Sequence, residues 1–565
     1  MRCRHIPEHL SSAFIANSLQ PTSSIQKMNE SLYTHLFNTN CVPSHEEIED
    51  IRVDLLSRSQ ELARIDERIR KLVVEHDKIQ KYIDAYRALI SHPRRLPPDI
   101  VREIFIAYLP TTVHAVMSAQ EAPLVLCRIC STWRTIALST PRLWASLHLP
   151  LDFILNKTEQ RMPAIARWLG LSGACPISLS VLGEDPFRVL FRRNILTDVN
   201  VFTKLLAQFS DRWSNIEFFD VSMAAATGFA AVHTPRMESL KITAETSVIR
   251  QLDLFRVPSL HTLALHAQGT EGLDDFVLDL PLFWDRLTHL NLDSTGPQSP
   301  SQGLSLYNVF VLLGRSPQLI SFAFRANTND HQADSISGLI ALPSLESFVL
   351  FEPSILEPSS IAHFLEHLFM PALRELHIPT VSARTEPATN FLQVVTVGTT
   401  SPMIQTLLFN LGSFIQSALL DALRCFPSLT KLAAFNLITY NEIWEEEFED
   451  VDVLSPDKFL ALLTPVGLEL LCPRLQEVQV RDCTDLLNGV VIEFIQRRRE
   501  LTAEFCKLGL LLKGWGKQDM SNLKDEIQPF APPGFDLCII NDDSWARPPA
   551  QATPWTGRPT INWSE

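Results

Sequence analysis

The segment from residue 216 to residue 480 repeats one short hydrophobic pattern, in which the first, fourth and sixth positions are apolar. The copies are Ile216/Phe219/Val221, Met237/Leu240/Ile242, Leu260/Leu263/Leu265, Leu287/Leu290/Leu292, Leu319/Phe322/Phe324, Leu345/Phe348/Leu350, Leu373/Leu376/Ile378, Ile404/Leu407/Phe409, Leu429/Leu432/Ala434 and Leu475/Val478/Val480. Their starts lie 21 to 46 residues apart, and a proline stands two residues before most of them. This period predicts a solenoid of short strands and helices, in which each unit buries its apolar side only against its neighbours. We expect residues 176–181 to form the strand that caps the array.

The array resembles a degenerate leucine-rich repeat, although its period drifts and no asparagine ladder follows the strands. The resemblance implies that the residues flanking the second apolar position of each copy face the concave side and form a substrate surface. These residues are Ser239, Lys241, His289, Asn291, Glu375, His377, Lys431, Glu477 and Gln479. Their charges are mixed and identify no ligand, and each residue singly also fits a plain solvated strand position.

Residues 48 to 90 place apolar side chains at alternating intervals of three and four. The positions are Ile48, Ile51, Leu55, Arg58, Leu62, Ile65, Ile69, Leu72, His76, Ile79, Ile83, Tyr86 and Ile90. Such a seam is the signature of a coiled coil. We therefore expect one helix that ends before Pro93 and mediates self-association or binds a partner helix. The alternative is a long helix that folds back onto its own domain.

Residues 96 to 147 form a small predicted helical unit that is rich in large apolar side chains. Pro97 and Pro98 suit the first turn of a helix, and Ile100, Ile104 and Tyr108 follow on one face. A second helix is expected over 124–138. A unit of about 50 residues has too little core to be very stable alone, so part of its apolar surface is expected to meet another chain.

Three blocks of this unit, LPPDIVREIF, VLCRICSTWRTIA and TPRLW, resemble in their order the F-box. In that family a leucine-proline pair opens the first helix, and a valine-cysteine-x-x-tryptophan-arginine pattern, here with Ile129 for valine, marks the third. The order of coiled coil, F-box and repeats is similar to that of F-box proteins of mushroom-forming fungi. The resemblance implies binding to a Skp-type adaptor and, through it, to the cullin of an SCF ubiquitin ligase. The residues that it places at or just under the adaptor surface are Leu96, Pro97, Ile100, Ile104, Phe105, Ile129 and Trp133, with Trp133 alternatively a core residue.

The net charge of the chain limits which partners it can bind, and its targeting features indicate its cellular compartment. The formal net charge is −15, which disfavours nucleic acid or an anionic membrane as a partner. No apolar run is long enough to span a membrane, the N-terminus has no signal-peptide core, and the ten cysteines lack framework spacing. We expect a cytoplasmic and/or nuclear protein. Arg497–Arg499 is either part of a nuclear signal or, as we expect, the solvated end of a helix.

Two short motifs of enzymes and metal sites occur in the chain. His363-x-x-Glu366-His367 matches an inverted zinc-protease motif, but helical spacing places these residues opposite the apolar face, toward solvent. A zinc hydrolase is therefore a remote alternative, in which the run Glu442–Glu447 could supply a further ligand. Cys127 and Cys130 form a single C-x-x-C and are expected to be two core positions of one helix. No catalytic residue, metal or cofactor is predicted.

These patterns predict a mixed fold with five parts. They are a loose N-terminus (1–44), a coiled-coil helix (45–92), an all-α F-box (94–148), an irregular α/β leucine-rich-repeat-like solenoid (165–512), and an extension with a proline-rich disordered tail (513–565). The expected function is a non-catalytic substrate-recognition adaptor of an SCF ubiquitin ligase that binds an unknown protein substrate. The main alternative is a scaffold or assembly protein that uses the adaptor outside ubiquitination.

Overall fold

The computed structural model describes two compact units, which divide the chain at Pro97. The described residues are 32–541 except 91, 112, 184–194, 230–231, 270–271, 296–302, 328–334, 352–357, 379–402, 412–415, 436–453, 467–469, 484–485, 513–522 and 532. The N-terminal 31 residues, the acidic run 442–452 and the proline-rich tail therefore lie outside the described residues.

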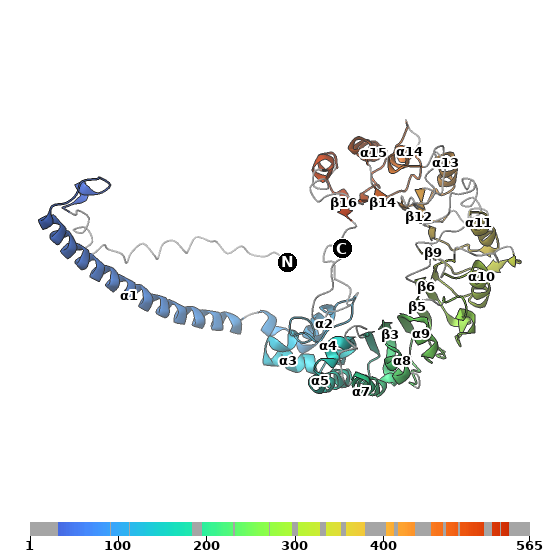
Figure 1. Ribbon diagram of the computed structural model, residues 1–565, viewed down its shortest axis with the longest axis horizontal. Helices are drawn as coiled ribbons and strands as arrows, with labels where there is room; N and C mark the ends of the chain where they lie inside the picture. Colours follow the sequence, from blue (N-terminus) through green and yellow to red (C-terminus); the bar gives the residue numbers. More distant parts are fainter. Residues whose placement is uncertain are drawn as a thin grey trace. The chain divides into compact units, whose positions relative to one another are not determined.

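One long helix, α1 (His45–Leu89), dominates the first unit (Figure 1). It follows the short 3₁₀ turn η1 (Thr34–Leu36) and precedes η2 (His92–Arg95). Its first turn is fixed by a capping box, in which the Ser44 side chain accepts from the Glu47 amide and the Glu47 carboxylate accepts from the Ser44 amide. The helix stops just before Pro93, as the sequence predicts. None of its residues is buried.

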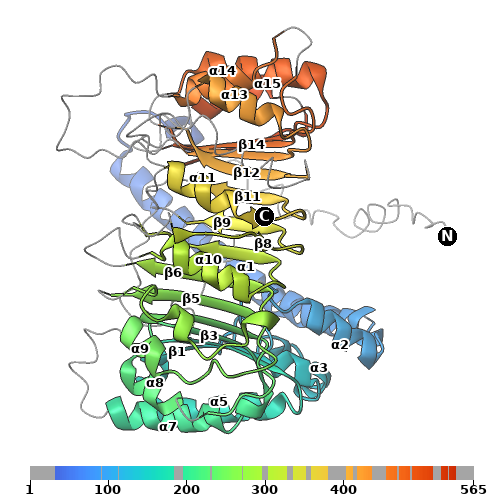
Figure 2. The same ribbon diagram turned by 90° about the vertical axis from the view of Figure 1, so that its right-hand side faces the viewer.

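A single parallel sheet of fourteen strands organises the second unit. The strands follow one another in chain order, and β8 (Ile340–Ala341) and β10 (Leu368–Phe369) form a separate pair. The fourteen are β1 (Ser146–Pro150), β2 (Ile177–Leu182), β3 (Trp213–Phe219), β4 (Ser239–Glu245), β5 (Thr262–Gln268), β6 (His289–Thr295), β7 (Ser321–Phe324), β9 (Ser347–Leu350), β11 (Glu375–Ile378), β12 (Thr406–Asn410), β13 (Lys431–Phe435), β14 (Glu477–Cys483), β15 (Lys507–Leu512) and β16 (Asp536–Asn541). Within this unit the strands line the inner side of a curve and the helices its outer side (Figures 1 and 2).

The strand register stacks the repeated apolar positions directly on one another. Leu240 pairs with Leu263, which pairs with Leu290, and the same row continues through Phe322 and Phe348. All of these side chains are at most 2% exposed. Because side chains alternate across a strand, this row and the row two residues later face the helices and form one continuous core.

The prolines that mark the repeats lie in the turns that lead into the strands. The amide of Leu260 donates to the carbonyl of Val257 at 3.1 Å, and the amide of Leu429 donates to that of Phe426 at 3.3 Å. Pro258 and Pro427 thus occupy the second position of a four-residue turn, where the fixed φ of proline is favoured. The proline spacing in the sequence therefore reports the turns of the solenoid.

Helices and 3₁₀ turns cover the outer face of the sheet. α10 shows how they do so, since Leu306, Val309, Leu312 and Leu313 are buried at helical spacing while Arg315 closes the last turn. The helices of this layer are α4 (Leu151–Leu155), α5 (Thr158–Leu171), α7 (Ile195–Ala207), α8 (Met223–Phe229), α9 (Thr246–Gln251), α10 (Leu306–Arg315), α11 (Pro358–Glu366), α13 (Gln416–Arg424), α14 (Pro456–Leu463) and α15 (Asn488–Leu501). The fold is thus mixed α/β with a parallel-strand solenoid.

The ends of the array differ from the sequence prediction. The first predicted copy is displaced by three residues, because Ile216 pairs with Leu240 and Trp213 fills its first apolar position. The edge strand is β1 rather than residues 176–181, which form the second strand. At the other end β16 joins the sheet beyond the predicted limit of 512. At β16 the first apolar position of the pattern fails, because Gly534 stands there although Pro532 precedes it.

Candidate protein-binding surfaces

An apolar face of α2 (Pro98–Ala107) is open to solvent. Ile100 is 48% exposed and Ile104 46%, and Tyr108, just past the helix end, is 63% exposed. The adjacent face carries Val101 and Phe105, both buried. A short helix that is apolar on both faces has more apolar surface than its own unit covers, which is typical of a binding site for another chain.

Two predicted adaptor contacts support this face from beneath. Phe105 is fully buried, and its ring meets that of the half-buried Trp133 edge-on with centroids 5.0 Å apart. Phe105 therefore lies under the exposed face rather than on it, because α3 (Ser131–Leu138) and its neighbours cover it. Trp133 packs against the core, which agrees with the alternative prediction that it is a core residue.

The predicted helix over 124–138 is interrupted at Cys130. Residues Leu126–Arg128 form the 3₁₀ turn η3, and Cys130 adopts an extended conformation as the N-cap of α3. Its sulfur accepts from the Trp133 amide at 3.4 Å, and the Arg134 side chain donates to the Cys127 carbonyl at 2.8 Å. Cys130 is exposed, so the prediction of two core cysteines on one helix is wrong. The break leaves Ile129 55% exposed.

The remaining predicted adaptor residues precede α2 in the chain. Leu96 is 37% exposed and Pro97 is exposed. Five residues of the predicted adaptor set are therefore exposed, namely Leu96, Pro97, Ile100, Ile104 and Ile129. The three isoleucines belong to the second unit.

The predicted substrate residues lie in two neighbouring rows on the inner face of the sheet. The first row contains Ser239, His289, Glu375, Lys431 and Glu477. The second contains Lys241, Asn291, His377 and Gln479. The register thus brings the flanking positions onto one face, as the repeat pattern predicts. Lys431 and Glu477 pair across strands, and His377 with Glu375 and Gln479 with Glu477 pair within one strand.

Glu217 on β3 is the centre of one charged cluster on this face. Its carboxylate lies 2.9 Å from the Lys241 ammonium and 3.4 Å from the His114 ring. Burial alone would raise the pKa of Glu217, but hydrogen bonds from His114 and Lys241 outweigh it and hold the pKa at about 2. The displaced register of the first copy hides this residue from the sequence analysis, because Glu217 does not flank the second apolar position assumed there.

A second cluster joins Asp293 on β6 to neighbouring strands. Asp293 accepts from Arg325 at 2.6 Å and lies 2.9 Å from His266. Burial opposes the charge of Asp293, and hydrogen bonds from His266 and Arg325 lower its pKa in spite of that burial. The prediction from the repeat pattern covers only the residues on either side of the second apolar position. It misses these three residues because each stands two positions further along its strand. Simple alternation of side chains along the strand would have found them.

Two more carboxylates, Glu375 and Glu477, are held on the inner face by cross-strand contacts. Glu375 accepts from Ser347 at 2.7 Å. Its carboxylate lies 3.0 Å from the His377 ring, and this contact is the chief cause that lowers its pKa to about 2. Glu477 lies 3.4 Å from Lys507 and 3.6 Å from Lys431. Burial would raise the pKa of Glu477, and its partners lower it overall. These charges are largely compensated before any ligand arrives.

A small apolar cluster separates the charged groups on the inner face. Leu408, Ala433 and Phe435 form it, apart from the main core, and the Arg481 guanidinium lies 5.0 Å from the Phe435 ring centre. Because its three members are at most 8% exposed, the cluster offers little apolar surface to a ligand.

The H-x-x-E-H motif lies at the end of α11. Ile361, Phe364 and Leu365 are buried, as predicted, while His363 and His367 are half-buried and Glu366 is exposed. The His367 Nδ1 atom is 2.8 Å from the carbonyl of His363, and the two rings meet edge-on. Among the residues that the structure describes, no group of three or more His, Cys, Asp or Glu side chains is arranged to hold a metal ion.

The arginine run 497–499 is not the solvated helix end that the sequence predicts. Arg498 is fully buried and donates to the carbonyls of Leu463, Leu471 and Cys472 at 2.6–3.0 Å. Burial lowers the pKa of Arg498 to about 10. The guanidinium thus links α15 to the end of α14. At most two arginines of the run, Arg497 and Arg499, are left for a nuclear signal. None of the described helices is long and apolar enough to cross a membrane.

The geometry defines a class of protein, an α/β repeat solenoid like that of leucine-rich-repeat proteins, preceded by a small helical unit with an open apolar face. No protein-family model matches the chain, and no curated protein matches it. Among solved structures, the chain is similar to one in the crystal structure of the Rad7 and Elc1 complex in yeast, with 14% identity and a TM-score of 0.36 over 78% of this chain and 94% of that chain. A TM-score this low does not establish a shared fold, and the proposals below rest on the residues of this chain.

Proposed function

We propose that the chain is a non-catalytic substrate-recognition adaptor of an SCF-type ubiquitin ligase. The observation that carries the proposal is the solvent-exposed apolar face of α2, where Ile100 and Ile104 stand nearly half exposed above a well-packed core. These positions match those at which the F-box resemblance expects contact with a Skp-type adaptor. Exposed apolar side chains of this size contribute to binding when a partner removes them from water.

The proposal assigns a separate task to each part of the chain. Residues 94–148 act as the F-box, with Leu96, Pro97, Ile100, Ile104 and Ile129 in contact with the adaptor. The inner face of the solenoid binds a protein substrate through Lys241, His289, Asn291, Glu375, His377, Lys431 and Glu477. The chain positions that substrate and supplies no catalytic group. Because ubiquitination takes place inside the cell, the expected location is the cytoplasm and/or the nucleus.

The long helix α1 supports a role in assembly. Its seam residues Leu55, Leu62 and Leu72 are each more than half exposed, although they are spaced to meet a partner helix. We propose that residues 48–90 mediate self-association. The same observation favours the second candidate function, a scaffold that binds the Skp-type adaptor outside a ubiquitin ligase.

Co-purification with cullin separates the two candidates. The tagged full-length chain is expected to recover a Skp-type adaptor and a cullin from cells, and Leu96→Ala with Pro97→Ala is expected to reduce both. Leu339→Ala, a change of an exposed leucine in the solenoid, is the matched control. Recovery of the adaptor without cullin would favour the scaffold. Unchanged recovery by the double variant would contradict the assignment of the surface.

A further inference from the structure

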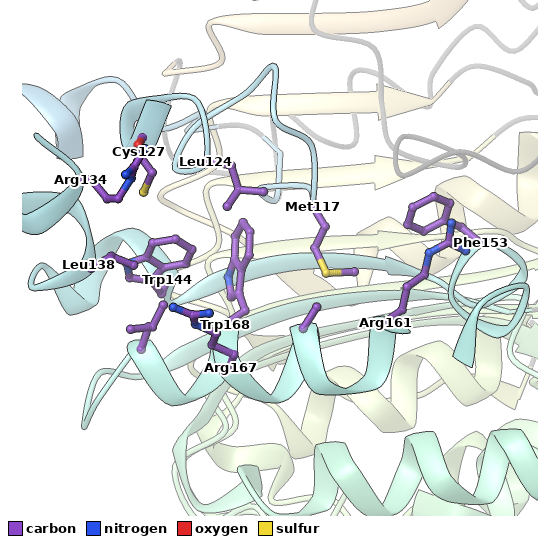
Figure 3. A pocket seen from close by; sticks show the side chains of 12 residues that line it. Met117, Leu124, Cys127, Arg134, Leu138, Trp144, Phe153, Arg161, Arg167 and Trp168 are labelled. Carbon is purple, nitrogen blue, oxygen red and sulfur yellow. Dashed lines mark hydrogen bonds between the residues drawn. The ribbon is translucent and has the colours of Figure 1, made fainter. Parts of the chain in front are cut away.

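A pocket of about 480 Å³ lies beside α5, on the helical side of the first strands (Figure 3). Its walls are mainly apolar and include Met117, Leu124, Trp144, Phe153 and Trp168. The volume is within the range of about 300–1,000 Å³ that is common for small-molecule sites. Because all lining residues belong to the second unit, the pocket is complete within it.

The polar groups of this pocket are almost entirely cationic. Three arginines line it, namely Arg134, Arg161 and Arg167, and its lining contains no acidic side chain. Arg134 donates to a backbone carbonyl. The Arg161 guanidinium stacks on the Phe153 ring, 3.6 Å from its centre, and its Nη1 atom is enclosed without a hydrogen-bond partner. Burial lowers the pKa of Arg161.

A second enclosed donor belongs to Trp168. This residue is 4% exposed, and its indole Nε1 atom has no hydrogen-bond partner. The neighbouring Trp144, whose ring meets Trp168 edge-on at 4.9 Å, donates its own indole hydrogen to the Ala137 carbonyl at 2.9 Å. A buried donor without an acceptor destabilises the fold, and buried polar groups of native proteins are rarely left unpaired. A ligand that supplies acceptor oxygens would remove this cost.

Helix geometry aligns these groups along one side of the pocket. Arg161, Ala164 and Trp168 recur at intervals of three and four on α5 and so lie on the same face. Arg161 and Trp168 are about 10 Å apart along the axis. Ala164 between them has a single methyl group, which leaves room for a ligand over the helix. Arginines thus lie at both ends of the site, Arg161 at one and Arg134 and Arg167 at the other, with an apolar middle (Figure 3).

We propose that this pocket binds a small amphipathic anion, with its carboxylate at Arg161 and its apolar body over Ala164 between Met117 and Trp168. The Arg161 guanidinium, with no carboxylate among the lining residues, selects the negative charge. The aromatic and aliphatic walls select the apolar body. The pocket includes residues of the segment 94–148, among them Met117, Leu124 and Arg134. It uses none of the proposed adaptor contacts Leu96, Pro97, Ile100, Ile104 and Ile129, so the two proposals can fail separately.

Calorimetric titration of the full-length chain with three probes of equal chain length tests the charge preference. Decanoate is expected to bind, decanol to bind at least about tenfold more weakly, and decyltrimethylammonium to show no binding at low millimolar concentration. Decanoate is also expected to raise the melting temperature. Equal affinity for decanoate and decanol, or no binding of decanoate, would overturn the proposal.

Variants locate the site. Arg161→Met keeps the length of the side chain and is expected to reduce decanoate affinity about tenfold while leaving decanol affinity unchanged. The decanol result also shows that the pocket of the variant is intact. Ala164→Phe fills the pocket and should abolish both. Arg256→Met, at an exposed arginine outside the pocket, is the matched control. Decanoate binding that survives both Arg161→Met and Ala164→Phe would place the ligand elsewhere and overturn the proposal.

Discussion

The indole ring of Trp133 stands edge-on to the phenyl ring of Phe105, with ring centroids 5.0 Å apart and ring planes at 68°. This contact joins α3 to α2 and explains why Trp133 is only partly accessible. Residues of α2 therefore divide into those that hold the helical unit together and those that remain open to a partner, although both kinds are apolar.

Replacement of neighbouring residues on α2 should separate these two roles. Phe105→Ala removes a fully buried ring and is expected to destabilise the fold by about 3–5 kcal/mol. Ile104→Ala, at a side chain 46% exposed, is expected to cost less than about 1 kcal/mol. Urea denaturation followed by circular dichroism measures both. Equal losses for the two variants would show that the open face of α2 is not open in solution.

Glu217 makes the stability of the solenoid depend on pH. Its pKa is about 2 in the folded protein, against an ordinary value of 4.5, so the folded state favours the ionised form. The stabilisation is complete above about pH 4.5 and is lost as the pH falls through 4.5 toward 2. Allowing for solvent screening at this partly exposed site, we expect about 1–2 kcal/mol.

The comparison that measures this effect is wild type against Glu217→Gln at several pH values. The difference in unfolding free energy should be constant near neutral pH and shrink below pH 4.5. Glu238→Gln, at an exposed carboxylate, is the matched control. A difference that grows as the pH falls would contradict the assigned contacts with His114 and Lys241.

The arginines at the end of α15 should differ sharply in their effect on stability. Arg498→Met leaves three buried carbonyls without their donor and is expected to cost about 3 kcal/mol. Arg497→Met changes a side chain that is 58% exposed and is expected to cost less than about 0.5 kcal/mol. Thermal unfolding of the two variants gives the comparison. Similar melting temperatures for both would mean that the buried network contributes little.

Self-association through α1 can be measured by sedimentation equilibrium of the full-length chain. We expect a concentration-dependent oligomer, because Leu62 and Ile69 are 60% and 52% exposed on the seam. Leu62→Asp with Ile69→Asp should give a monomer, since charges on the seam oppose helix pairing. The control is Arg64→Asp, at an exposed position off the seam. A monomeric wild-type chain at all concentrations would contradict the proposed role of α1.

Much of the solenoid is predictable from the sequence because its core repeats locally. The turn proline and the apolar triplet lie within eight residues of each other, so the register from β4 to β14 follows from the sequence pattern. Prediction fails where the pattern is ambiguous. Ile216, Phe219 and Val221 fit the pattern as well as Trp213, Ile216 and Phe218 do, and only pairing with β4 decides between them. Strands β1, β15 and β16 enter the sheet without the full signature.

The candidate sites were harder to predict than the fold because they depend on contacts distant in the chain. The charged group at Glu217 requires His114 from a loop over 100 residues earlier, and no local spacing reveals it. The burial of Phe105 follows from its contact with Trp133, and the burial of Arg498 follows from carbonyls of residues 463–472. Periodicity shows which face of an element is apolar, but it does not show what covers that face.

The most direct test of the central claim is the affinity of the purified full-length chain for a purified Skp-type adaptor, measured by calorimetry for wild type and for Ile100→Asp with Ile104→Asp. The account predicts that wild type binds and that the double variant, with unchanged unfolding, loses affinity by about 100-fold or more. Wild-type protein that does not bind the adaptor, or a double variant that binds as tightly as wild type, would contradict it.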